Sequence, residues 1–167
     1  TAIDGVLFDK AVTKLVYYPT DRSGNYTLPD TIIEIGDRVF QNKTGLTGIT
    51  IGKNVKTIGV GAFRGCNKLE YITFVDGGTE KLTIGNDAFY GCSVMDNIVL
   101  PARLVDIGAN AFNNCKKIVK LVIPEGVTHI GAGAFSSCSY MTEVSLPKSL
   151  ETMDLDIKGL FTVFSGC

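Results

Sequence analysis

The sequence contains no tryptophan and only 1 histidine, and its positive and negative charges nearly balance. Against 16 Lys and Arg residues stand 17 Asp and Glu residues, which gives a formal net charge of −1. Because nucleic-acid binding needs an excess of positive charge to neutralise phosphates, this balance argues against such a partner. No stretch approaches the ~18 consecutive apolar residues of a membrane-spanning helix, so we expect no membrane insertion.

The chain is built largely from internal repeats. Five segments share the pattern I-G-x-x-A-F-x-x-C, except that the first copy has Val39 for Ala and Lys43 for Cys. A period near 23 residues is typical of a solenoid that winds one coil per repeat, in the range of leucine-rich repeats. The glycines of the five segments, which lie 23, 26, 23 and 23 residues apart, are Gly36, Gly59, Gly85, Gly108 and Gly131.

The rest of the period follows the template L-x-x-I-x-L-P-x-x-V-x-x-I-G. The alternation in I-x-L predicts a short strand with one buried face, and proline should end that strand because it lacks an amide hydrogen. We expect the Ile-Gly pair to turn the chain, since glycine accepts backbone angles that other residues resist. The three-residue spacing of Phe and Cys favours one face of a short helical turn.

The template therefore predicts an α/β solenoid, a right-handed leucine-rich-repeat superhelix of about six 23-residue coils. Short parallel strands should lie on one face and short helical turns on the other. Because one coil cannot bury its apolar side chains alone, the coils must share a continuous core. In that core we expect a ladder of stacked rings formed by Phe63, Phe89, Phe112 and Phe135.

Both ends of the chain depart from the template. Residues 1–21 contain two short apolar segments and predict a β-hairpin cap over the open end of the first coil. Residues 22–167 should form the solenoid. Its last coil is irregular, because the V-F-x-x-C segment comes about six residues late, so residues 154–160 are expected to bulge outward as an insertion. Three extra residues within 75–81 predict a surface loop.

These motifs resemble the BspA-type leucine-rich repeat family over roughly residues 5–167. The opening Asp4–Phe8 and Leu15–Pro19 also resemble the segment that precedes repeat arrays in that family. The resemblance implies a non-enzymatic role in adhesion or host-protein binding, at an extracellular or cell-surface location in host-associated bacteria. An export signal would then have been removed or lie outside this sequence. Further support comes from four matching steps into proline, Leu28-Pro29, Leu100-Pro101, Ile123-Pro124 and Leu146-Pro147.

The 5 cysteines are the first candidates for chemistry. Since all hold the same repeat position, they should rise through the solenoid as a column, and buried, reduced thiols are the favoured interpretation. A disulfide between neighbours and a zinc site are the weaker alternatives, because the side chains point in parallel and no C-x-x-C motif occurs. The five residues are Cys66, Cys92, Cys115, Cys138 and Cys167.

Other candidate groups give no catalytic or cofactor pattern. His129 precedes Ile130 in a variable position, which favours a solvated turn residue over a catalytic base. Glu151, Asp154 and Asp156 in the irregular coil favour a solvated acidic loop over a calcium site. Gly59-Val60-Gly61 lacks the third glycine of a phosphate-binding loop. We therefore expect no catalytic residues, no metal and no cofactor.

What remains is the outward side of the predicted I-x-L strands, which we call the strand face. Solenoids use such sheet surfaces for binding, and Tyr71 is the aromatic anchor candidate. The alternative is a plain solvated sheet whose residues only favour strand formation. Gly48 and Thr50 begin this face, and the candidate partner-binding residues are Tyr71, Thr73, Asn97, Val99, Lys120, Val122, Glu143 and Ser145.

Two classes of function follow from the strand face. The first is a protein-interaction module of an exported surface protein that binds a host or matrix protein or a glycan. The second is a structural spacer in a larger surface protein, with no binding role of its own. In either case we expect a monomer. A signal peptide, further repeats or an anchoring domain in a longer sequence would discriminate between the two.

Overall fold

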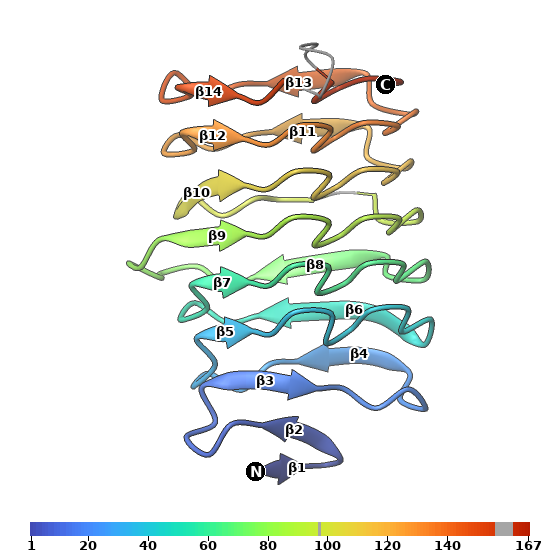
Figure 1. Cartoon of the computed structure of the whole chain (residues 1–167), viewed down its shortest axis with the longest axis vertical. Coiled ribbons are helices and arrows are strands. Elements are labelled where there is room, and N and C mark those ends of the chain that lie inside the picture. Colours follow the sequence, from blue (N-terminus) through green and yellow to red (C-terminus); the bar gives the residue numbers. More distant parts are fainter. Residues whose placement is uncertain (97, 156–161) are drawn as a thin grey trace.

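The computed structural model describes residues 1–96, 98–155 and 162–167, and these form stacked coils (Figure 1). The chain rises in a right-handed sense, and its two termini lie at opposite ends of the stack. A solenoid of about six coils is thereby confirmed. The strands are β1 Ala2–Ile3, β2 Val6–Phe8, β3 Lys14–Tyr17, β4 Gly24–Thr27, β5 Glu34–Ile35, β6 Leu46–Ile51, β7 Thr57–Ile58, β8 Tyr71–Phe74, β9 Leu82–Ile84, β10 Leu104–Ile107, β11 Lys120–Val122, β12 His129–Ile130, β13 Glu143–Ser145 and β14 Thr152–Met153.

The longest sheet runs the whole length of the solenoid, and we call it the Ile-Gly sheet. Its strands follow the order β1-β2-β3-β5-β7-β9-β10-β12-β14. Equivalent isoleucines of successive coils are register partners, as Ile35 is with Ile58. The amide of Gly59 continues the ladder by donating to Ile35 O at 2.8 Å. The prediction that Ile-Gly turns the chain was therefore wrong, because the isoleucine ends a strand and the glycine extends its hydrogen bonding.

The glycine of each Ile-Gly pair is required by close stacking. None of these five glycines has a positive φ. A Cβ on Gly108 would lie 2.6 Å from Asn86 N and 2.7 Å from Gly85 C, which are backbone atoms of the preceding coil. Such distances are shorter than any van der Waals contact of carbon. The coils can approach each other here only because the side chain is missing.

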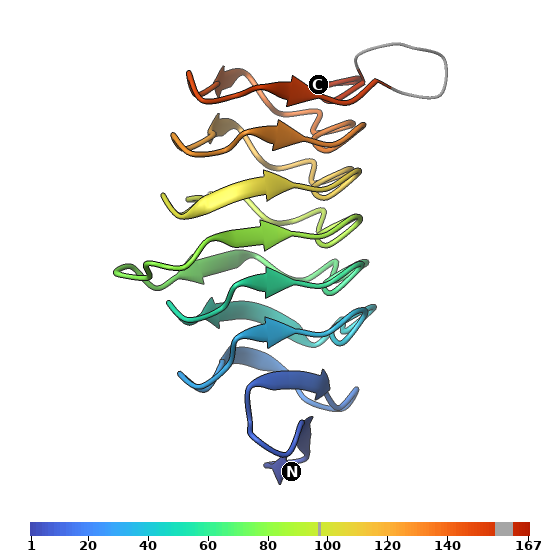
Figure 2. The same cartoon turned by 60° about the vertical axis from the view of Figure 1, so that its left-hand side comes forward.

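The predicted I-x-L strands lie on the other side of each coil, where Figure 2 shows them behind the Ile-Gly sheet. They form two parallel sheets, β4-β6-β8 and β11-β13. The register places Ile49 beside Ile72 and Leu121 beside Val144. Short parallel strands on this face are therefore confirmed. Between the two sheets, Ile98–Leu100 of the intervening coil is not in a strand.

The A-F-x-x-C segments form consecutive turns, and the described residues contain no helix, so the prediction of short helical turns was wrong. Alternate amides point along the solenoid axis: Phe63 N donates to Ala88 O at 2.7 Å. The amides between them close turns, as Cys66 N does with Phe63 O at 3.1 Å. In each of the five coils with an Ile-Gly pair, two residues four apart also adopt the left-handed region, such as Asn110 with φ 54° and Asn114 with φ 62°. A right-handed helix cannot continue through such residues.

The core is a set of side-chain columns that run along the solenoid axis. The four predicted phenylalanines are fully buried at 0% exposure and stack face to face, which confirms the ladder. Centroids of Phe112 and Phe135 lie 5.2 Å apart with an interplanar angle of 2°. Phe40 and Phe164 extend the ladder at its two ends. Ring stacking therefore repeats at nearly the spacing of the backbone ladders.

The N-terminal segment forms an antiparallel unit in which β2 pairs with both β1 and β3. β3 then pairs in parallel with β5, so the Ile-Gly sheet continues from this unit into the coils. Tyr18 is 1% exposed, and its ring centroid lies 4.7 Å from that of Phe40 at the base of the ladder. The domain division at residue 21 stays a prediction. Most of the predicted 154–160 insertion lies outside the described residues.

We predict that Phe112→Ala lowers the free energy of unfolding by about 3–5 kcal/mol, because it leaves a large cavity between two stacked rings. Urea denaturation followed by circular dichroism measures this loss. Val99→Ala is the control, since Val99 is 77% exposed and its truncation should change stability by less than about 0.5 kcal/mol. A loss below about 1 kcal/mol for the phenylalanine variant would contradict the ladder.

A second prediction concerns the glycines. Gly108→Ala should destabilise the protein by about 1–3 kcal/mol, because the added methyl group forces neighbouring coils apart. Gly52→Ala is the matched control, since its added Cβ would meet nothing nearer than Asp30 Oδ1 at 3.9 Å. Thermal unfolding of both variants checks the comparison. Equal stability of the two proteins would mean that close stacking does not require this glycine.

Candidate functional site

The strand face consists of two columns of outward-pointing side chains, set by the strand register. Gly48 pairs with Tyr71 and Thr50 with Thr73 in one sheet. Lys120 pairs with Glu143, and Val122 with Ser145, in the other. Asn97 lies outside the described residues. The structure therefore brings the predicted residues of each sheet side by side, whereas the place of Asn97 stays a prediction.

Tyr71 is a half-exposed aromatic residue at the N-terminal half of the strand face. Its ring lies over Gly48, because a Cβ on that glycine would be only 2.6 Å from Tyr71 Cε2. The side chain keeps 38% of its surface exposed. The missing side chain of Gly48 thus gives the ring a flat support on the neighbouring strand.

The apolar part of the strand face is formed by two valines of successive coils. Val99 is 77% exposed and Val122 is 65% exposed, which are high values for valine side chains on a folded protein. Thr73 and Ser145 on either side of them are also exposed. The valines contribute nothing to the core, so their presence here is not explained by packing.

Charge on the strand face is paired. Lys120 Nζ lies 2.8 Å from Glu143 Oε2, and both side chains are more than half exposed. The hydrogen bond from Lys120 to Glu143, followed by their charge attraction, raises the pKa of the lysine. Exposed pairs of this kind add little to stability. Their effect is to leave the face without net charge.

A cleft beside the strand face was missed by the sequence reasoning. It has a volume of about 260 Å³ and is bordered by Thr73 and Phe74 of β8, by Val99, and by Pro101 with its neighbours. Asp76, in the three-residue insertion, also lines it. The signal available in the sequence was that insertion, which lengthens the connection after β8.

Arg103 links two coils next to this cleft through hydrogen bonds of its side chain. Its guanidinium reaches two coils back, where Nη2 donates to Gly52 O at 3.2 Å and Nη1 donates to Val55 O. Burial lowers the pKa of this arginine. The side chain passes Gly78 of the inserted loop, where a Cβ would lie 2.9 Å from Arg103 Cδ. The missing side chain of Gly78 therefore leaves room for the side chain of Arg103.

The cysteines form the predicted column. Four of them are buried free thiols and Cys167 is an exposed free thiol, which agrees with the expectation of reduced and mostly buried cysteines. Each Sγ donates to the carbonyl of the phenylalanine one coil before it, for example Cys115 to Phe89 O at 3.2 Å. Burial raises the pKa of Cys66 and of Cys138 to about 12. Such thiols are poor nucleophiles.

Lys43 takes the cysteine position in the first coil. It is 9% exposed, and its Nζ donates to Thr20 Oγ1 at 2.8 Å. The ammonium also lies 5.2 Å from the centroid of the Tyr17 ring. The substitution is thus accommodated by polar and aromatic partners in the N-terminal segment.

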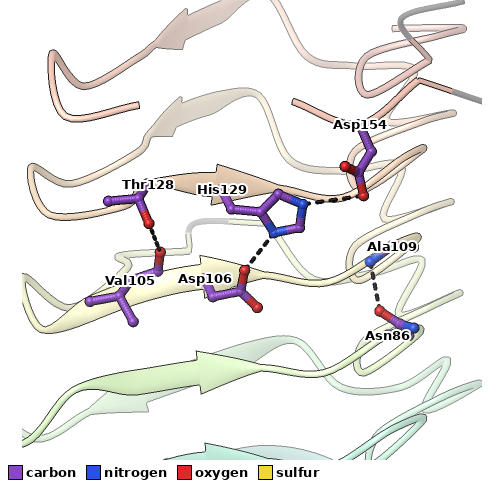
Figure 3. A network of polar contacts seen from close by, with 7 residues as sticks. All are labelled: Asn86, Val105, Asp106, Ala109, Thr128, His129 and Asp154. Carbon is purple, nitrogen blue, oxygen red and sulfur yellow. Dashed lines mark hydrogen bonds and ion pairs between the residues drawn. The ribbon is translucent and has the colours of Figure 1, made fainter. Parts of the chain in front are cut away.

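His129 is not the solvated turn residue that the sequence suggested, because it belongs to β12 and contacts two carboxylates (Figure 3). Asp106 and Asp154 are its partners. Glu151 is exposed, and Asp156 lies outside the described residues. Among residues 1–96, 98–155 and 162–167, no cluster of three or more His, Cys, Asp or Glu side chains has the arrangement of a metal site. In the same part of the chain, no helix is long and apolar enough to cross a membrane.

The columns of Phe, Cys and Ile, the single-coil period and the flat outer strands together specify the repeat type. A family model for the BspA-type leucine-rich repeat region, in six copies, matches residues 11–82 and 77–157. The protein belongs to the BspA-type leucine-rich repeat family. This confirms the resemblance drawn from the I-G-x-x-A-F-x-x-C segments. A search of curated proteins finds none that matches.

Solved structures of bacterial leucine-rich repeat proteins are similar to this BspA-type chain. A leucine-rich cell surface protein from Faecalibacterium prausnitzii has a TM-score of 0.78 and 30% identity, covering 91% of this chain and 44% of its own. A leucine-rich repeat protein from Bacteroides ovatus has a TM-score of 0.77 and 32% identity, covering 100% and 45%. The pneumococcal vaccine antigen PcpA has a TM-score of 0.69 and 27% identity, covering 91% and 35%. The chain spans less than half the length of each.

We predict that the thiols of this BspA-type chain differ sharply in reactivity. In the native protein, Cys167 should react quickly with Ellman's reagent near pH 8, whereas the four buried thiols should react slowly, because burial suppresses both access and the thiolate form. Denaturation should expose all 5 thiols. Rapid native labelling of Cys92, Cys115 or Cys138, located by mass spectrometry, would contradict the column.

Proposed function

We propose that this BspA-type chain is a non-enzymatic interaction module of a bacterial surface protein, and that it binds a host or matrix protein or glycan through the strand face. The observation that carries the proposal is the pair of exposed valines of successive coils, Val122 on β11 and Val99 in the non-strand segment between the two outer sheets. Solenoid repeats hold such residues in fixed columns and use the sheet surface for recognition.

Chemistry on the strand face suits contact with another surface better than catalysis. Tyr71 offers an amphipathic ring, which is the side-chain type enriched at binding hot spots. The 260 Å³ cleft next to Val99 adds a depression that can receive an apolar side chain of the partner. The family is a repeat scaffold, and the buried thiols with their raised pKa values offer no nucleophile.

Electrostatics should contribute little to recognition. The ion pair of Lys120 with Glu143 leaves no net charge on this part of the strand face. Long-range attraction then accelerates binding only weakly, and salt should have little influence on it. The proposed contact therefore depends on shape and apolar area.

Size limits the expected affinity. Six coils at about 4.8 Å spacing and about 15 Å of width give on the order of 400 Å². A standard interface buries about 800 Å² per partner. We therefore expect dissociation constants in the micromolar range or weaker for the isolated chain. Cell-surface location is part of the proposal, and the similarity to the Faecalibacterium prausnitzii cell surface protein supports it.

The proposal is tested with purified extracellular-matrix glycoproteins, each immobilised intact and after enzymatic deglycosylation, in surface plasmon resonance. We predict that wild type binds at least one of them. Tyr71→Ala and Val122→Asp should each weaken that binding at least tenfold, because they remove the ring or place a charge in the apolar strip. Loss of binding on deglycosylation would identify a glycan ligand, and unchanged binding a protein ligand.

Val60→Asp is the matched control, because it makes the same change at a 40% exposed valine outside the strand face. It should leave binding unchanged, and circular dichroism should show that all variants are folded. Equal binding by wild type and both strand-face variants would place the contact elsewhere. Absence of binding by wild type would support the spacer function instead.

A further inference from the structure

His129 connects three successive coils of the Ile-Gly sheet (Figure 3). Its Nδ1 lies 2.5 Å from Asp106 Oδ1, and its Nε2 lies 3.2 Å from Asp154 Oδ2. Asp106 is the register partner of His129 on β10. Asp154 directly follows β14, whose Thr152 pairs with His129 from the other side. One imidazole therefore stands between carboxylates of the coil before it and the coil after it.

This geometry specifies the protonation state of the ring. An ionised carboxylate only accepts hydrogen bonds, so each ring nitrogen must carry a hydrogen to bond to its partner. Neutral imidazole has one N–H and can satisfy only one of the two aspartates. The imidazolium form has two N–H groups and can donate a hydrogen bond to each of the two aspartates.

Within the described residues, the two strands that flank His129 offer it acids and no cation. On β10, Asp106 is the only charged residue, and Arg103 before that strand directs its guanidinium to the carbonyls of Gly52 and Val55. β14 itself carries no charged residue, and it is flanked by the acids Glu151 and Asp154. Both neighbouring strands thus present only negative charge to the ring.

The coil of β14 has less apolar burial than the coils before it. Among the strands of the described residues, β14 pairs with β12 at the end of the order of the Ile-Gly sheet. Met153 is only partly buried, whereas the equivalent Ile107 and Ile130 are 0% exposed. Less apolar burial holds this coil in place, so polar contacts carry a larger share of its stability.

We propose that His129 is a proton-dependent bridge that fixes the last coil to the solenoid. When the ring is protonated, it joins Asp106 to Asp154 and holds β14 against β12. When the ring loses its proton, one carboxylate loses its donor, and the last coil opens more often.

The direction of the pH dependence follows from linkage. Burial lowers the pKa of His129, but the hydrogen bonds and charges of Asp106 and Asp154 outweigh it, so the pKa is raised above 6.5. A group whose pKa is higher in the folded protein stabilises the fold fully below its unfolded pKa. That contribution is lost as the pH rises through the folded pKa. Mild acid therefore closes the bridge, and alkaline conditions open it.

The first test follows the ring by NMR. Since the chain has 1 histidine, the Cε1–H signal reports His129 without assignment ambiguity. In wild type, the titration midpoint should lie above 6.5, and in the double variant Asp106→Asn/Asp154→Asn it should fall, because both carboxylates are gone. A wild-type midpoint at or below 6.5, or an unchanged midpoint in the double variant, would overturn the proposal.

The second test measures opening of the last coil by hydrogen exchange with mass spectrometry on peptides covering residues 141–155. After correction for intrinsic exchange, protection in wild type should fall at least threefold between about pH 6 and about pH 9. His129→Gln should show low protection at both pH values. Glu34→Gln is the control, because it breaks the Lys14–Glu34 ion pair near the other end of the same sheet. It should leave the protection of residues 141–155 as in wild type. Wild-type protection that does not change with pH would refute the bridge even if the ring titrates as expected.

Discussion

The structure depends on one constraint, which is that backbone amides on the two strand sides and on the turn side of a coil bond to the adjacent coil, with an interruption at Ile98–Leu100. The Ile-Gly sheet does this at β5 and β7, and the strand face does it at β6 and β8. The turns between them do it through alternate amides such as that of Phe63. Because all three ladders have nearly the same spacing, aromatic rings and thiols one repeat apart stack without strain. Any residue whose side chain would enter this spacing is excluded, and the Ile-Gly glycines are the clearest case.

This constraint also decides where function can reside. The inward positions are occupied by the core columns, and the turn amides are used between coils. Freedom of sequence is left on the outer side of the coils, where Tyr71, Val99 and Val122 are exposed. The three-residue insertion at 75–81 adds the cleft bordered by Phe74 and Pro101. In a BspA-type solenoid, recognition is therefore expected from columns of outward side chains, extended by loops between coils.

Polar contacts between coils follow the 23-residue period of the repeat. Asp106 and His129 are 23 residues apart, as are Lys120 and Glu143, because each pair holds one repeat position in adjacent coils. Arg103 departs from this rule by reaching the carbonyl of Val55, 48 residues away, beside the inserted loop. The first kind of contact ties neighbours together, and the second fastens a coil across an irregularity. Such ties should matter most where apolar burial is reduced, as it is at Met153.

The sequence by itself determined the repeat, its period and the columns of buried residues, because buried side chains appear as apolar residues at the same position of every repeat. Phe63, Phe112 and the thiol of Cys115 could be placed from that pattern, and so could the outward position of Val122. The partners of the backbone hydrogen bonds cannot be read from that pattern. The Ile-Gly strands, and the turns that replace helix in the described part of the chain, were therefore decided only by stacking. Residues that tolerate the left-handed region, such as Asn110 and Asn114, were the one available signal of those turns. Asn and Gly serve many kinds of turn, however, and which nitrogen of His129 meets which aspartate depends on atoms that adjoin only when the coils are stacked.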